Sequence, residues 1–441
     1  MTAPMSASSS FPRLRRAALA LAAMTALGAQ AQTVPELHAL AAKEQPALMK
    51  TLQQLVEIES GSSDRQGLDR IAGVIAQRLR ELGGQVQLID PDKTIAAPTS
   101  DAGDGPAKVG QVVQASFKGG NANGKRVMLI AHMDTVYQRG GLKQQPFRID
   151  GNHAYGLGIA DDKQGVATIL HALAMLKSVG FKDYAEITVL INGDEEIGSP
   201  GSNPLITKLG GEHDAVLSFE GGGGPTTPDT VRLATSGIAS VDLKVKGRSS
   251  HAGAAPEKGI NALTELSHQI LQTRDLSDPK RGLHLNWTMS KAGSVRNAIP
   301  ERAEAQGDAR ADRFSDFDAL EAELRKRIQN KLVPDAEVTL SFNRGRPPLS
   351  ATDASRALAA KVKALADEQK LELVVRDRPT GGGTDAAYAS LATKAPVIEG
   401  LGVRGYGAHS SDSEYVVVDA IAPKLVLVTR LVMAIGSGKA L

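Results

Sequence analysis

Short apolar segments and one long helical segment alternate in the first half of the chain. The segments Val127–Ala131, Ile187–Ile191 and Ala215–Phe219 are runs of mostly apolar residues, as expected of buried strands. A helical pattern covers residues 163–178, between the first two runs. Strands that alternate with a long helix indicate a mostly parallel sheet with helices on its faces. The chain is therefore predicted to have an α/β fold.

A different pattern begins near residue 237. The strands expected there are more amphipathic, and two helices, Gly259–Gln272 and Phe317–Gln329, lie between them. The resulting β-α-β-β-α-β-like order is typical of a ferredoxin-like α+β module. From residue 351 the sequence returns to a helix, two short strands and a final helix over Ile421–Ile435. We therefore predict an inserted domain over residues 237–347 within a first domain formed by residues 32–236 and 348–441.

The first 31 residues have the features of a secretory signal peptide. Three arginines between positions 13 and 16 precede the apolar run Ala17–Ala29, and Ala29-Gln30-Ala31 is a small-x-small cleavage motif. The run holds about 13 residues, whereas a membrane-spanning helix needs about 20. The sequence thus favours a signal peptide cleaved after Ala31 over a stable membrane anchor. The mature protein is expected in the periplasm or outside the cell.

Charge and composition exclude several classes of function. The chain has 51 Lys and Arg against 49 Asp and Glu, and without the three arginines of the signal peptide its formal charge is −1. A near-neutral chain with 3% aromatic residues has little with which to bind nucleic acid. The absence of cysteine excludes disulfides, thiolate nucleophiles and Cys-ligated metals. Any metal must be held by His, Asp and Glu.

Ionisable residues stand at the ends of the predicted strands. His132 and Asp134 end the first strand, and strand alternation puts both on one side, where the carboxylate can hold the imidazole of a metal-binding histidine. A structural strand-end histidine is an equally good interpretation. Asp161 and Asp162 come just before the long helix. Taken alone, they are better explained as an N-cap and a first-turn acid.

The segment Asp194-Glu195-Glu196 is a stronger signal. Three consecutive carboxylates after a buried strand repel one another and are costly unless a cation or solvent compensates them, so a metal site and a solvated loop are the two alternatives. Glu220 ends another strand, and His409 lies in a late loop. We expect four successive strand ends to bring such residues to one edge of a sheet. Oxygen ligands with two imidazoles suit zinc or a related divalent ion.

In this order and spacing the residues resemble the M20 family of di-zinc metallopeptidases, and most closely its glutamate carboxypeptidases of the carboxypeptidase G type. The resemblance runs from about Pro35 to Lys439. It rests on five motifs: Ala131-His132-Met133-Asp134, Gly158–Lys163, Asp194-Glu195-Glu196-Ile197-Gly198, Ser250-His251-Ala252-Gly253 and Gly381-Gly382-Gly383-Thr384-Asp385.

The resemblance implies two zinc ions per subunit, although other divalent metals are possible. His132 and Glu220 would ligate one ion, and Glu196 and His409 the other, with Asp161 bridging both. These assignments come from the family likeness and not from spacing alone.

Catalytic roles follow from the same resemblance. Glu195 would be the general base, Asp134 would orient His132, and the peptide between Asp161 and Asp162 would be cis. The inserted module would be the lid and dimerisation domain, so that the protein is expected to be a homodimer. His251 of that module would polarise the scissile carbonyl, although without the resemblance an exposed loop histidine is the simpler interpretation.

The implied substrate-binding residues are Asn297, Arg310, Arg346 and Gly382. Arginine suits a terminal carboxylate because its guanidinium can bind it bidentately, but solvated arginines on the module surface explain them equally well. Arg344 competes with Arg346 for this role. Gly382 permits a close approach of the backbone to a ligand, and a helix-entry turn is the alternative.

The function that we predict is hydrolysis of the amide bond to a C-terminal glutamate, in N-acyl-glutamates or folate-type substrates. A deacylase or aminoacylase of the same family is an alternative, and a non-catalytic periplasmic solute-binding protein is a more remote one. Glutamate at position 220 favours the carboxypeptidases and deacylases over the dipeptidases of the family. The glycines Gly221–Gly224 that follow it depart from the expected acid-Pro sequence.

Overall fold

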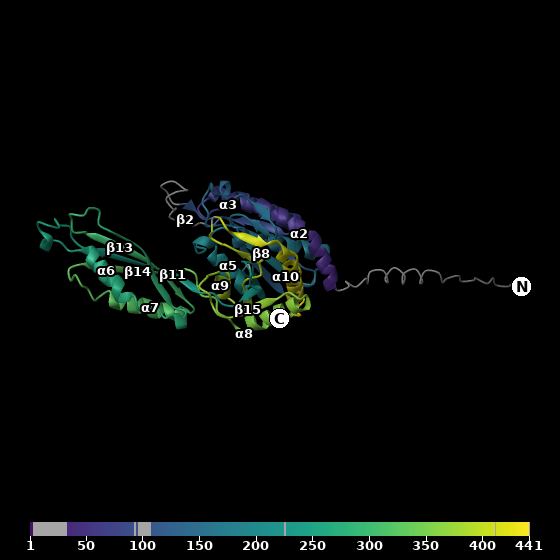
Figure 1. Cartoon of the computed structure of the whole chain (residues 1–441). Helices are drawn as coiled ribbons and strands as arrows, with labels where there is room; N and C mark the ends of the chain where they lie inside the picture. The colour runs from purple at the N-terminus through teal and green to yellow at the C-terminus, as the bar shows by residue number, and fades with distance from the viewer. Residues whose placement is uncertain (3–32, 92–93, 96–106, 225, 411, 441) are drawn as a thin grey trace.

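The protein has two lobes of unequal size (Figure 1). The structure, a computed structural model, describes residues 1–2, 33–91, 94–95, 107–224, 226–410 and 412–440. Nearly all of the predicted signal peptide and the predicted loop over residues 101–106 lie outside these ranges. No helix among the described residues is long and apolar enough to cross a membrane.

A six-stranded sheet forms the centre of the larger lobe, with the strand order β1-β4-β8-β5-β9-β16. Strands β8, β5, β9 and β16 are parallel, whereas β4 is antiparallel to β8 and to β1. The predicted α/β fold is confirmed, with an antiparallel edge. In sheet order the strands are β1 (Gln85–Ile89), β4 (Val112–Lys118), β8 (Glu186–Asn192), β5 (Arg126–His132), β9 (Ala215–Ser218) and β16 (Val397–Ile398).

Both faces of this sheet are covered. In β5, Val127 and Leu129 join one apolar cluster with α2, α3, α4, α8 and α10, while Met128 and Ile130 join another with α5 and α9. Because the two faces are both buried, the strand is apolar at successive positions rather than at alternate ones. The helices are α2 (Val34–Val56), α3 (Arg65–Glu81), α4 (Gln164–Ser178), α5 (Asn203–Gly211), α8 (Asp353–Glu368), α9 (Ala386–Ser390) and α10 (Ile421–Gly436).

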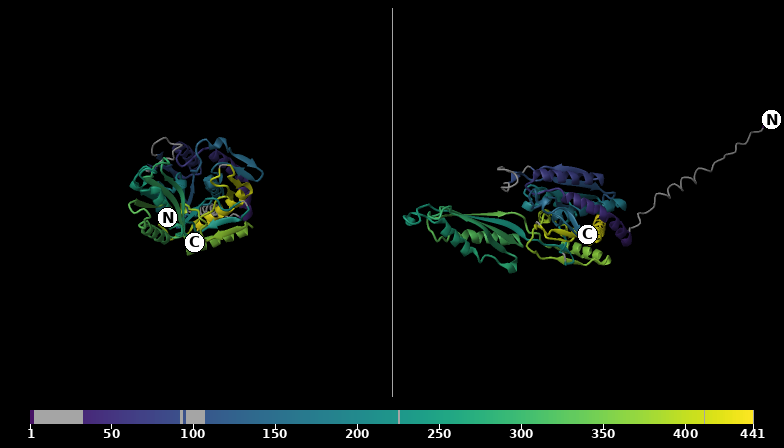
Figure 2. Two further views of the ribbon diagram at one scale, coloured as in Figure 1. Left: turned by 60° about the vertical axis from the view of Figure 1, so that its left-hand side comes forward. Right: turned by 45° about the horizontal axis from the view of Figure 1, so that its top comes forward.

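The smaller lobe has the predicted β-α-β-β-α-β order and projects from the larger lobe (Figure 2). Its antiparallel sheet has the order β12-β13-β11-β14, and α6 and α7 pack on it to form a separate apolar core. The domain boundaries at residues 237 and 347 stay predictions. The elements are β11 (Gly237–Lys246), α6 (Ala262–Thr273), β12 (His284–Ala292), β13 (Arg302–Ala311), α7 (Phe314–Arg327) and β14 (Glu337–Arg344).

Three small sheets complete the larger lobe. One, with the order β17-β18-β7-β6, contributes to the functional site, because the loop between β17 and β18 carries His409. The short strands are β2 (Thr94–Ile95) with β3 (Ala107–Lys108), β10 (Asp229–Arg232) with β15 (Leu373–Arg376), and β6 (Arg148–Asp150), β7 (His153–Tyr155), β17 (Gly405–Tyr406) and β18 (Tyr415–Val417).

Candidate metal centre and substrate cleft

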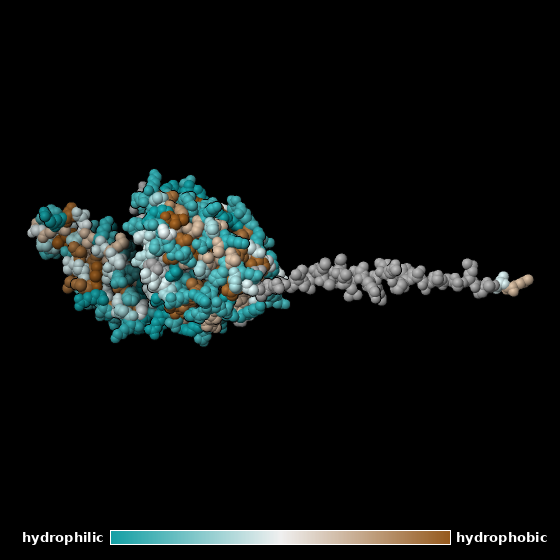
Figure 3. Space-filling view, turned by 45° about the vertical axis from the view of Figure 1, so that its right-hand side comes forward, coloured by the Kyte–Doolittle hydropathy of each residue, from teal (hydrophilic) through white to brown (hydrophobic). Residues whose placement is uncertain are grey.

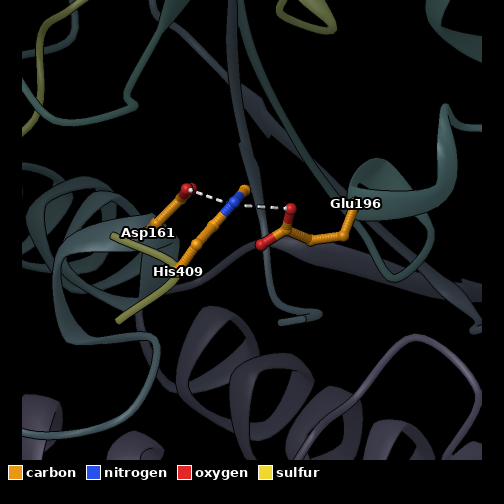
Figure 4. Close-up of side chains that lie close together, drawn as sticks. All are labelled: Asp161, Glu196 and His409. Atoms are coloured by element: carbon orange, nitrogen blue, oxygen red, sulfur yellow. Dashed lines mark ion pairs between the residues drawn. The ribbon is translucent and has the colours of Figure 1, made fainter. Parts of the chain in front are cut away.

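Asp161, Glu196 and His409 come together at one end of the central sheet (Figure 4). The Nε2 atom of His409 lies 3.3 Å from Oδ2 of Asp161 and 3.2 Å from Oε2 of Glu196. One potential ligand atom from each residue lies within 4.8 Å of the other two. The residues come from three separate segments, namely the approach to α4, the turn after β8 and the loop between β17 and β18.

His132, at the end of β5, joins this cluster from the opposite side of Asp161. Its Nε2 atom lies 3.0 Å from Oδ1 of Asp161, and its side chain is 2% exposed. The two oxygens of the Asp161 carboxylate therefore face two different imidazoles, as in a bridging ligand. Glu220, just after β9, lines the same cavity as Asp161 and Glu196. The structure thus brings together all five predicted ligands.

The position of Asp161 corrects one expectation. It does not end a strand of the central sheet. It lies between β7, which belongs to a small separate sheet, and the start of α4. The peptide between Asp161 and Asp162 is cis, in line with the family resemblance.

Glu414 holds the Asp161 loop and was not singled out in the sequence. Its fully buried carboxylate accepts hydrogen bonds from the N–H groups of Gly158, Ala160 and Asp161 and from the hydroxyl of Tyr137. A single glutamate outside any motif gives no local signal for such a role. The only hint in the sequence is its place five residues after His409.

Asp134 acts on the site mainly through the turn after β8. Its carboxylate accepts hydrogen bonds from the N–H groups of Glu195 (3.0 Å) and Glu196 (3.1 Å) and from the hydroxyl of Ser62 (2.7 Å). The Nδ1 atom of His132 lies 3.1 Å from the main-chain oxygen of Asp134 and 3.4 Å from its Oδ1. The carbonyl therefore makes the shorter contact with the imidazole, where the sequence led us to expect the carboxylate.

The electrostatics of the cluster suit a divalent cation. Hydrogen bonds to Asp161 and Glu196 raise the pKa of His409 to about 10. Burial lowers the pKa of His132, but the carboxylates around it outweigh burial and raise it well above the ordinary value. Oε1 of Glu196 is buried without a hydrogen-bond partner among the described residues. Two imidazoles, several carboxylates and an unpartnered carboxylate oxygen fit a metal ion such as zinc.

Glu195 is buried beside the cluster and is paired with Arg346. Burial raises the pKa of Glu195 to about 8, and Arg346 opposes this shift. The Nη1 atom of Arg346 lies 2.7 Å from Oε1 of Glu195, and Nη2 donates to the main-chain oxygen of Glu195 at 2.5 Å. Arg344 instead pairs with Asp318 and Glu321 of α7. Of the two candidate arginines, Arg346 is therefore the one that contacts the cluster.

A cavity of about 610 Å³ opens between the two lobes next to the cluster. Figure 3 shows the surface hollowed where the lobes join. Among the predicted substrate-binding residues, Arg310, Arg346 and Gly382 line this cavity. Arg310 is bound to Asp308 and donates to the main-chain oxygen of Gly381 at 3.3 Å. We name this cavity the arginine cleft.

His251 and Asn297 are not among the described residues that line the arginine cleft. They lie together in the smaller lobe, where the N–H of Ala252 donates to the main-chain oxygen of Asn297 at 2.9 Å. The Nδ1 atom of His251 accepts hydrogen bonds from the N–H groups of Gly253 and Ala254. Its Nε2 atom is therefore the protonated one and is available as a donor. Within one chain in this arrangement, the two residues are not at the cluster.

The glycines after Glu220 have a physical cause. A methyl group on Gly222 would lie 2.3 Å from the main-chain oxygen of Gly400, and Gly223 has a φ of +130°. Neither position accepts another residue without rearrangement. The departure from the expected sequence thus reflects close packing of this loop on residues 400–405.

Comparison with known proteins assigns the chain to a family. Residues 128–434 match the profile of Peptidase family M20/M25/M40. Carboxypeptidase G2 of Pseudomonas sp. (strain RS-16) is 44% identical over 424 residues, which cover 96% of this chain and 97% of that protein. The chain belongs to the M20 peptidase family, as the sequence predicted. It is a metallopeptidase of the carboxypeptidase kind and is close to carboxypeptidase G2, and its family implies the use of a divalent metal.

More distant relatives share the fold. A tripeptidase of Staphylococcus aureus has a TM-score of 0.73 at 18% identity, with 89% of this chain and 98% of that chain covered. An M20 family metallo-carboxypeptidase of Sulfolobus solfataricus has a TM-score of 0.69 at 18% identity, with coverage of 88% and 98%. A succinyl-diaminopimelate desuccinylase of Methylobacterium radiotolerans is 28% identical over 85% of this chain and 93% of its own.

Proposed function

We propose that the protein hydrolyses the amide bond to a C-terminal glutamate in N-acyl-glutamates or folate-type substrates, with two divalent cations, most simply zinc, at the cluster. The observation that carries this proposal is the Asp161 carboxylate, whose oxygens lie 3.0 and 3.3 Å from the imidazoles of His132 and His409. Glu220 would complete the first site and Glu196 the second. When bound, the cations would polarise the substrate carbonyl and increase the acidity of a water molecule.

Glu195 is the proposed general base. Its carboxylate is buried next to the cluster and is held by Arg346. In this role it takes the proton of the attacking water and returns it to the leaving amine. The N–H groups that Asp134 binds fix the turn that carries Glu195, so the base has little freedom to move.

The arginine cleft supports specificity for glutamate. Arg310, Arg344 and Arg346 line it, and arginine recognises carboxylates through paired hydrogen bonds. Arg310 is the proposed anchor of the terminal carboxylate, because Arg346 is bound to Glu195 and Arg344 to α7. Gly382, on the same cleft, leaves room for the substrate backbone.

His251 is the proposed donor to the carbonyl oxygen of the substrate, with Asn297 beside it. Either the lobes close or a second copy of the chain must bring this Nε2–H to the cluster. We propose that the protein is a homodimer formed through the smaller lobe, which light scattering of the purified protein tests directly. A monomer of full activity would overturn the dimer.

The experiment that tests the function combines metal analysis with a substrate panel. The mature protein is loaded with zinc, its metal content is measured, and kcat/KM is determined for N-benzoyl derivatives of glutamate, aspartate, alanine and lysine. We expect two metal ions per chain and a preference for glutamate of about 100-fold, or about 2.7 kcal/mol. Preference for another amino acid supports the deacylase alternative, and cleavage of no N-acyl amino acid supports the binding protein.

Two arginine variants sharpen this test. Arg310→Ala is expected to raise KM for N-benzoyl-glutamate, because the carboxylate loses its anchor. Arg344→Ala is the matched control, since its guanidinium pairs with Asp318 and Glu321. Equal effects of the two variants would remove Arg310 from this role.

We also propose export to the periplasm or beyond, supported by the signal-like pattern of residues 1–31. N-terminal sequencing of the protein recovered from cells should begin at Gln32. An intact N-terminus would contradict the proposal.

A further inference from the structure

A second cavity meets the arginine cleft at the metal cluster. This cavity of about 670 Å³ is walled by glycines of two loops, residues 221–224 and 405–407, and we name it the glycine groove. Four residues line both cavities: Asp161, Glu220, Gly382 and Gly383. The cluster therefore lies where the two cavities join. A substrate whose scissile amide is at the cluster has its amino-acid side in one cavity and its acyl side in the other.

The two cavities differ in charge. The arginine cleft has three arginines, whereas Arg232 is the only cationic side chain among the described residues that line the glycine groove. Its Nη2 atom donates to the main-chain oxygen of Gly221 at 2.9 Å. Glu399, also on this groove, is fully buried and accepts hydrogen bonds from the Thr384 hydroxyl and the Gly400 N–H. The groove thus offers a carboxylate much less compensation than the cleft does.

Tyr406 is the aromatic side chain of the glycine groove. It lies in β17, three residues before His409, and is 57% exposed. Its ring packs at 6.3 Å from that of Tyr415, which lies 5.3 Å from the ring of Tyr155 and 4.2 Å from that of His153. Three of the six tyrosines of the chain are therefore in this stack. The stack supports Tyr406 from one side and leaves the rest of its ring to the groove.

We propose that the glycine groove binds the acyl side of the substrate and selects an uncharged aromatic acyl group through the ring of Tyr406. This inference rests on the proposed function, which supplies the N-acyl-glutamate. Glycine walls leave the width that a planar ring requires, and a Cβ on Gly382 would meet no atom within 4 Å. A succinyl group is disfavoured, because its carboxylate would lie near Asp161, Glu220 and Glu399 with Arg232 as its only cationic partner.

The test compares three acyl groups on one amino acid. The metal-loaded protein is assayed with N-benzoyl-, N-acetyl- and N-succinyl-glutamate, and kcat/KM is measured for each. We expect benzoyl to exceed acetyl by about tenfold, since stacking is lost with the ring, and succinyl to be the poorest. In Tyr406→Ala the benzoyl substrate should lose about tenfold, while the acetyl substrate stays within about twofold. Tyr406→Phe should keep the preference for benzoyl.

A matched control is Phe314→Ala, which removes an aromatic ring that is 44% exposed in the smaller lobe, outside both cavities. It should leave the ratio between the three substrates unchanged. A loss of equal size for benzoyl and acetyl in Tyr406→Ala, or a succinyl substrate as good as benzoyl, overturns the inference while the glutamate carboxypeptidase stands. Cleavage of none of the three overturns the proposed function instead.

Discussion

Glu414 binds the main-chain N–H of Asp161 through its Oε1 atom at 3.1 Å, although 253 positions separate the two residues. The same Oε1 accepts the N–H of Ala160 at 2.8 Å, and Oε2 accepts the N–H of Gly158 at 2.8 Å and the hydroxyl of Tyr137 at 2.5 Å. Glu414 follows the loop that carries His409. One buried carboxylate therefore joins two segments that each supply a proposed metal ligand.

Replacing Glu414 by glutamine should weaken metal binding. An amide nitrogen would face two of the four donors, so the Asp161 loop would lose part of its support. We expect the dissociation constant of the metal to rise by about 10- to 100-fold, the usual effect of removing a partner that orients a ligand. Competition with a chromogenic chelator measures this constant.

The matched control for Glu414→Gln is Glu265→Gln in the smaller lobe. Glu265 is also fully buried, and it accepts hydrogen bonds from the N–H of Val333 and the side chain of Gln269. It should lower stability without changing the metal dissociation constant. Equal metal loss in both variants would mean that Glu414 acts only through general stability.

Glu195→Gln should separate metal binding from turnover. Glutamine keeps the size of the side chain and can still accept from Arg346, but it cannot take a proton from water. We expect kcat to fall by about 10²- to 10⁴-fold while the metal content measured by mass spectrometry is unchanged. Retained turnover would exclude Glu195 as the base.

Gly382→Val should block the junction of the two cavities. Its φ is outside the left-handed region, and a new side chain would extend into open space. We expect unchanged thermal stability and a large loss in kcat/KM for all N-acyl-glutamates. The neighbouring Gly381 has a φ of +98°, so Gly381→Val should instead lower stability, by about 1–3 kcal/mol. A fully active Gly382→Val enzyme would place the substrate elsewhere.

His213 should make the stability of the protein depend on pH. Burial lowers the pKa of His213, whose ring nitrogens lie 2.7 Å from the main-chain oxygen of Leu209 and 2.8 Å from the hydroxyl of Thr188. The unfolded chain takes up a proton near pH 6.5, where the folded protein does not. The contribution to stability is therefore complete above about pH 6.5 and is lost as the pH falls toward the lowered folded pKa.

Urea unfolding of the wild type and of His213→Gln between pH 7.5 and 5 measures this effect. The variant is expected to be less stable at pH 7.5 and to lose less stability on acidification. An identical pH dependence of the two proteins would show that His213 does not titrate differently in the folded state.

Several elements followed from local patterns. The strands β5, β8 and β9 were predicted because strands buried on both faces must be apolar at successive positions, and the β-α-β-β-α-β order of the smaller lobe followed from amphipathic periodicity. Strand β12 was not located, because it lies at the edge of its sheet and most of its residues are exposed, which leaves no periodic signal.

The sequence by itself determined the α/β class, the family and the residue types that a metal site needs, since these depend on composition, order and short motifs. The tertiary structure decided that Asp161 enters from outside the central sheet, that Glu414 holds its loop and that Arg346 rather than Arg344 binds Glu195. These contacts join positions 151 to 253 residues apart. Only the packed chain sets such distances, because no local pattern encodes which distant side chains meet.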